Sequence, residues 1–89
     1  MALFDLLGRR WTLRVIWELR EDTLTFRELQ LRCGGVSSSV LNQRLSELRA
    51  AGILEQAPRE GYRLTREGQT LLSALTPLQG WAARWSERS

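Results

Sequence analysis

The stretch from Thr25 to Leu64 constrains the fold of this chain most strongly, because several local signals follow one another within it. A short helix is predicted to begin after Thr25, since Thr25 and Glu28 have the Thr-x-x-Glu spacing of a capping box. The pair Gly34-Gly35 then indicates a tight turn. A helix followed by such a turn is the first half of a helix-turn-helix unit, and the next residues decide whether a second half exists.

The second half of the unit is predicted over residues 37–51, where three serines open a helix that Gly52 stops. Ile53–Ala57 reads as a strand, Pro58–Gly61 supplies turn residues, and Tyr62–Leu64 alternates as a returning strand. Helix, turn, helix and hairpin in this order predict a winged helix-turn-helix. The fold class is therefore expected to be mainly α with a small β-hairpin wing, in a single domain spanning residues 1–89.

Helices are also predicted on both sides of this unit. A short apolar helix covers Leu3–Leu7, and a second covers about Arg10–Arg20 with apolar residues around most of its circumference. The last helical region begins at Thr65, and Pro77 falls inside its pattern. Pro77 is expected either to kink this helix or to start a new one with Thr76 as N-cap.

The helix over residues 37–51 has two contrasting faces. Leu41, Leu45 and Leu48 share one face, while the opposite face is polar but almost uncharged. Amide and hydroxyl side chains can approach base edges in the major groove, whereas an ordinary solvated face would carry more charge. A plain polar surface is the competing interpretation. The predicted base contacts are Ser39, Asn42, Gln43 and Ser46.

Contacts to the phosphate backbone are predicted from serines at the start of this helix and from arginines along it and in the hairpin. Two of the arginines have competing interpretations. Arg44 lies near the core flank of the helix, so an internal salt bridge competes with DNA contact, and Arg59 could be an incidental residue of a solvated turn. The predicted set is Ser37, Ser38, Arg44, Arg49, Arg59 and Arg63.

The terminal helices carry more apolar surface than one small core requires, including tryptophans that are costly to leave in water. We therefore expect a homodimer interface there. Three alternatives stay open: a fully buried second helix, a last helix folded over its own core, and a small apolar effector bound between the terminal helices. The predicted interface residues are Leu3, Phe4, Leu13, Trp17, Leu75, Leu78, Trp81 and Trp85.

Composition excludes several function classes. The net charge of +3, with all 13 basic residues being Arg, weakly favours an acidic partner such as double-stranded DNA. The absence of His excludes imidazole chemistry, and no Gly-rich phosphate loop is present, so we expect no enzyme, no metal site and no cofactor. One Cys and no long apolar run indicate a cytoplasmic protein with no membrane segment.

Several motifs follow one another along the chain, at Leu6–Leu13, Phe26–Leu29, Val36-Ser37, Leu41–Leu48, Ala51–Leu54, Gly61–Thr65 and Gly68. In their order and spacing these motifs resemble those of the HxlR-type transcriptional regulators, which are related to the MarR-type regulators. The resemblance implies a winged helix, dimerisation through the terminal helices and binding to pseudo-palindromic operator DNA. It also implies a recognition helix at residues 37–51 and a wing at residues 59–63.

Some members of that family sense oxidants through a Cys just before the first helix. This chain has no Cys there, and Cys33 lies elsewhere, so the thiol switch is not carried over to it. As a small apolar residue next to a turn, Cys33 is expected to be structural.

The alternative function is a winged-helix protein–protein interaction module that does not bind DNA. The weakly charged polar face of the predicted recognition helix and the arginines of the hairpin argue against this alternative. A gel-shift titration with random duplex DNA would separate the two functions.

Overall fold

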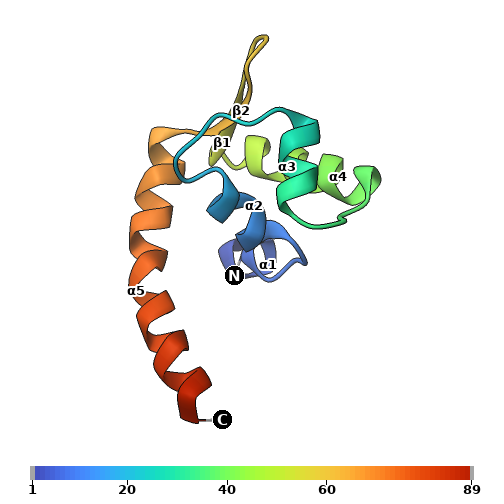
Figure 1. Ribbon diagram of the computed structural model, residues 1–89. Coiled ribbons are helices and arrows are strands. Elements are labelled where there is room, and N and C mark those ends of the chain that lie inside the picture. The colour runs from blue at the N-terminus through green and yellow to red at the C-terminus, as the bar shows by residue number, and fades with distance from the viewer. Residues whose placement is uncertain (1, 89) are drawn as a thin grey trace.

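The computed structural model describes residues 2–88, and their side chains up to Glu87. A compact body of four helices carries a β-hairpin at one end, and a long last helix extends away from it (Figure 1). The overall extents are 44 × 26 × 25 Å. The elements are α1 (Ala2–Leu7), α2 (Thr12–Glu18), α3 (Phe26–Arg32), α4 (Ser38–Ala50), β1 (Leu54–Ala57), β2 (Gly61–Leu64) and α5 (Arg66–Arg88). The predicted winged helix-turn-helix is confirmed.

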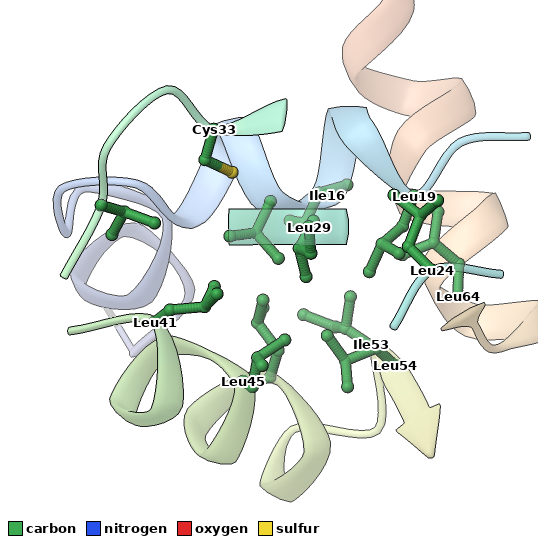
Figure 2. Close-up of a cluster of buried hydrophobic side chains, with 13 residues drawn as sticks. Ile16, Leu19, Leu24, Leu29, Cys33, Leu41, Leu45, Ile53, Leu54 and Leu64 are labelled. Carbon is green, nitrogen blue, oxygen red and sulfur yellow. The ribbon is translucent and has the colours of Figure 1, made fainter. Parts of the chain in front are cut away.

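The core lies between α2, α3 and α4, and Figure 2 shows side chains from these helices pointing toward one another. Leu41, Leu45 and Leu48 are almost completely buried, as the predicted apolar face of α4 requires. Ile16 and Leu29 meet them from α2 and α3. Each such side chain contributes about 1.5–3 kcal/mol through burial, so these leucines fix which way α4 faces.

Side-chain caps define the start of α3. The Thr25 hydroxyl accepts a hydrogen bond from the Glu28 backbone N–H at 3.1 Å, and the Glu28 carboxylate accepts one from the Thr25 N–H at 2.9 Å. The predicted capping box is therefore present. The hydrogen bond from the Thr25 backbone N–H, followed in size by an interaction of the carboxylate with the Thr25 side chain, holds the pKa of the Glu28 carboxyl below its usual range.

The wing is a two-stranded antiparallel hairpin in which Leu54 pairs with Leu64 and Ala57 with Gly61. The sequence did not reveal that Leu24 adds a third segment to it. The N–H and C=O groups of Leu24 exchange hydrogen bonds of 2.9 and 2.7 Å with Tyr62. This bridge ties the wing to the chain before α3, which limits how far the wing can move relative to the core.

Some predicted boundaries are wrong by one or two residues. The helix predicted over Arg10–Arg20 is only Thr12–Glu18, because Trp11 adopts a left-handed conformation (φ 78°) that a helix cannot include. The first strand starts at Leu54 rather than Ile53. The returning strand starts at Gly61, whose φ of 118° suits glycine.

The last helix is continuous through Pro77, so the alternative of a new helix capped by Thr76 is wrong. Thr76 lies inside the helix, and its hydroxyl donates to the Leu72 carbonyl at 2.8 Å. The alternative in which this helix folds over its own core is also wrong for its second half, because Leu78 and the two tryptophans beyond it are more than half exposed. The fully buried second helix is wrong as well, since Leu13 is exposed.

None of the helices in residues 2–88 combines the length and the apolar character needed to cross a membrane.

Close packing of α5 against the start of the wing gives a stability prediction. A Cβ on Gly68 would collide with the backbone carbonyl of Ile53, whereas a Cβ on Gly80 would have only an ordinary contact with the end of Arg84. Gly68→Ala should therefore lower the free energy of unfolding by about 1–3 kcal/mol, in the range of other overpacking changes. Gly80→Ala should raise it by roughly 0.5–1 kcal/mol, because alanine favours a helix interior.

Urea unfolding followed by circular dichroism measures both values. Equal effects of the two substitutions would show that the approach of Gly68 to Ile53 does not constrain this helix.

Candidate nucleic-acid interface

The outward face of α4 is the most distinctive polar surface of the molecule. Ser39, Asn42, Gln43 and Ser46 are all exposed and lie on the side opposite the buried leucines. This strip has no charged member, and it is about two turns long. Its side chains present hydroxyl and amide groups, which can both donate and accept hydrogen bonds.

The turn between α3 and α4 sets the direction of this strip. Gly34 and Gly35 have φ values of 69° and 106°, a conformation that L side chains rarely adopt. The Gln30 side-chain amide donates to the Val36 carbonyl and to the Ser38 hydroxyl, both at 3.1 Å. Sequence reasoning missed this role of Gln30, because an amide near a helix end has no distinctive pattern.

The N-terminus of α4 is exposed and well capped. The Ser37 hydroxyl accepts a hydrogen bond from the Val40 N–H at 3.1 Å, and Ser37 and Ser38 are both exposed. The first backbone N–H groups of a helix lack intrahelical acceptors, and the helix dipole makes this end electropositive. The predicted serines therefore lie where an anionic group would be favoured.

The predicted arginines of the wing differ in how far their charges are balanced. Arg63 is close to two carboxylates, Glu55 at 3.2 Å and Glu60 at 3.9 Å. Arg59 lies in the turn with a φ of 67°, and it is exposed without a carboxylate partner among residues 2–88. Arg59 therefore carries the least compensated charge of the wing.

The other predicted arginines are on α4. Arg49 is exposed, and its guanidinium donates to the Gln56 side chain at 3.4 Å, close to the wing. The Arg44 side chain is only 12% exposed and forms an ion pair with Glu47 at 2.6 Å. Of the two interpretations of Arg44, the internal salt bridge is the one that forms in the structure.

Cys33 is buried in the core, where a structural residue was expected. Burial raises the pKa of its thiol, with Arg14 opposing this effect and Glu18 adding to it. A buried thiol with a raised pKa reacts poorly, because the thiolate is the nucleophile. Within residues 2–88, no three His, Cys, Asp or Glu side chains gather as metal ligands would.

A second surface lies on α1, α2 and α5 and is apolar. Most of its predicted members are exposed large hydrophobic side chains, among them Phe4 at 67% and Trp85 at 59%. The rings of Trp81 and Trp85 stack with centroids 6.0 Å apart and planes 8° apart. We call this the terminal-helix surface, and its members are Leu3, Phe4, Leu13, Trp17, Leu75, Leu78, Trp81 and Trp85.

The terminal-helix surface includes an apolar groove between α2 and α5. Leu13 and Trp17 form one wall, and Leu75, Leu78 and Ala82 belong to the other. Four of the predicted interface residues are therefore brought together in space by this groove: Leu13, Trp17, Leu75 and Leu78.

Known structures share this architecture. The quinone-bound YodB of Bacillus subtilis superposes with a TM-score of 0.85 at 31% sequence identity, covering 93% of this chain and 92% of YodB. A possible HxlR family transcriptional factor from Thermoplasma volcanium has a TM-score of 0.86 at 24% identity, covering 98% of this chain and 84% of that one. The second likeness shows the fold alone.

Sequence comparison gives the same assignment. An HTH-type transcriptional regulator of Methanocaldococcus jannaschii is 29% identical over an alignment of 91 positions, which covers 98% of this chain and 85% of the relative. The model of the HxlR-like helix-turn-helix family matches residues 6–89. The chain therefore belongs to the HxlR-like helix-turn-helix family, and it is a winged-helix transcriptional regulator.

Proposed function

We propose that this regulator acts as a homodimer on pseudo-palindromic operator DNA, with α4 of each subunit in the major groove. The observation that carries the proposal is the exposed, uncharged strip of α4, held outward by the buried leucines behind it. Asn and Gln can each make two hydrogen bonds to adenine, and Ser accepts either kind of base. The proposed base contacts are Ser39, Asn42, Gln43 and Ser46.

Contacts to the phosphate backbone would fix the position of α4 along the groove. Ser37 and Ser38 are at the electropositive helix N-terminus, Arg49 continues the same side of the helix, and Arg59 and Arg63 are in the wing. We leave Arg44 out of this set, because its guanidinium is occupied inside the protein. Arg63 is the weakest member, since Glu55 and Glu60 already compensate its charge.

The terminal-helix surface is the proposed dimer interface. A second copy would cover the stacked Trp81 and Trp85 and fill the groove between α2 and α5, which removes apolar area from water. Two α4 helices related by a two-fold axis would then meet half-sites about 34–36 Å apart, one turn of DNA.

Selection of bound duplexes from a random DNA pool tests the proposal directly. The expected result is a recurrent site with two inverted halves, together with twice the mass of one chain in sedimentation at micromolar concentration. Failure to enrich any sequence would reject sequence-specific binding, and gel shifts with random duplexes would then show whether the chain binds DNA at all.

Asn42 and Gln43 should determine sequence preference. Replacing both by Ala should reduce the ratio of affinities for the selected and random duplexes by about tenfold or more, because bidentate contacts discriminate by about 1–3 kcal/mol each. Gln69→Ala is the matched control, because it deletes an exposed side-chain amide of α5. If the double variant keeps the ratio of the wild type, neither residue reads bases.

Arg59 should contribute affinity without sequence preference. Arg59→Ala should weaken binding to every duplex and make the slope of log K against log salt shallower by about one unit, because one phosphate contact releases roughly 0.9 counterion. Arg84→Ala is the matched control, because Arg84 lies in the half of α5 that extends away from the wing (Figure 1). A slope equal to that of the wild type would remove Arg59 from the phosphate contacts.

Leu78 should be needed for the dimer. Leu78→Glu places a charge on the terminal-helix surface, where Leu78 is 54% exposed, and should shift the protein to a monomer at micromolar concentration. Leu31→Glu is the matched control, since Leu31 is 72% exposed on α3, outside that surface. Sedimentation velocity measures both variants. A dimer that survives Leu78→Glu unchanged would place the interface elsewhere.

A further inference from the structure

Arg44 and Glu47 connect α4 to the segment between α1 and α2. One oxygen of the Glu47 carboxylate accepts from Arg44 Nη1 at 2.6 Å, and the other lies 3.2 Å from Arg9 Nη1. Arg44 Nε donates to the backbone carbonyl of Arg10 at 2.9 Å. We call these four residues, Arg9, Arg10, Arg44 and Glu47, the Arg44–Glu47 network.

The segment that the network holds is under local strain. Trp11 has a left-handed φ of 78°, which costs a residue with a side chain roughly 1–2 kcal/mol. The peptide bond whose orientation this angle sets contains the Arg10 carbonyl, which is the acceptor of the Arg44 hydrogen bond. Strained backbone persists where surrounding contacts over-determine it, and such positions concentrate at functional sites.

The α4 half of the network is sheltered from solvent, whereas the Arg9 side chain is 48% exposed, and the network lies beside the polar strip of α4. The Arg44 and Glu47 side chains are only 12% and 22% exposed. Glu47 follows Gln43 by one helical turn, and Arg44 is the next residue after Gln43. A change in the network would therefore act on α4 next to the side chains that are proposed to contact bases, and would shift or rotate them.

We propose that Arg44 and Glu47 are positioning residues for sequence recognition, which fix α4 by holding it to residues 9–11. This inference rests on the proposed function. The leucines define which face of α4 is buried, and the network defines where the helix lies along and around that face. Base contacts need placement within about 0.5 Å and 10–20°, which a packed leucine face alone does not guarantee.

The charge of Glu47 makes the proposal testable, because electrostatics and positioning predict opposite changes in affinity for the selected duplex. Glu47→Gln removes a negative charge from a protein that binds a polyanion, so electrostatics alone would strengthen binding to any duplex. A positioning role predicts the opposite effect on the selected duplex, because misplaced amides lose their base contacts. The electrostatic effect acts on both duplexes and cancels in the ratio of their affinities. The loss of base contacts affects only the selected duplex and therefore lowers that ratio.

Fluorescence anisotropy titrations with the selected and random duplexes would test the proposal, using the 89-residue chain and its variants at temperatures well below their thermal unfolding midpoints. Glu47→Gln should lower the ratio of affinities by about tenfold, on the order of one well-aligned base contact, and leave binding to the random duplex equal or stronger. Arg44→Lys keeps the charge but loses the planar fork that serves two acceptors, so it should lower the ratio as well.

Glu18→Gln is the matched control, because it removes the carboxylate of the Arg14–Glu18 ion pair on α2 without touching α4. It should leave the ratio unchanged even if it lowers the unfolding midpoint. A role in stability alone would change that midpoint in Glu47→Gln and leave the ratio as in the wild type, which would overturn the inference.

If Glu47→Gln does not fold, Arg44→Lys tests the inference in its place. A ratio of affinities equal to that of the wild type in Arg44→Lys would also overturn the inference. A wild type that binds both duplexes equally would overturn the proposed function and this inference together.

Discussion

The burial of three leucines on one side of α4 is the constraint on which the rest of the structure depends. Leu41, Leu45 and Leu48 occupy the core at spacings of four and three residues, so the residues between them must face outward. The outward face of α4, which carries the proposed base contacts, is thus a geometric consequence of the core. A sequence can change its outward residues, which are the proposed base contacts, while the same leucines preserve the fold.

The parts of the fold that could be predicted are those that local signals determine. The capping box places the start of α3 at Phe26, and the serines and Gly52 bracket α4 within one residue of its observed ends. Periodicity then assigned the two faces of α4 correctly, because a helix with one apolar stripe has only one stable orientation against a core.

The parts that could not be predicted depend on contacts between distant residues. Leu24 pairs with Tyr62 across 38 positions of sequence, and neither residue has a local signal for that bridge. Trp11 has a left-handed backbone conformation next to the Arg10 carbonyl, which Arg44 holds. The position at which the second helix begins therefore depends on a residue far along the chain. Sequence spacing places Arg44 and Glu47 on one flank of α4, but it offers no means of locating Arg9 beside them.

The positions of the tryptophans have a consequence for spectroscopy. Trp11 is the N-cap of α2 and follows Arg10, whose carbonyl Arg44 of α4 holds, while Trp17 lies within α2. Trp81 and Trp85 lie on α5, and neither α4 nor the hairpin contains a tryptophan. Intrinsic fluorescence of this chain therefore reports mainly the surroundings of the terminal helices, and it senses α4 only through Trp11. An emission change on adding DNA would mean that residues outside the proposed base-contacting strip had responded, so this native optical signal can detect such a response without any attached dye.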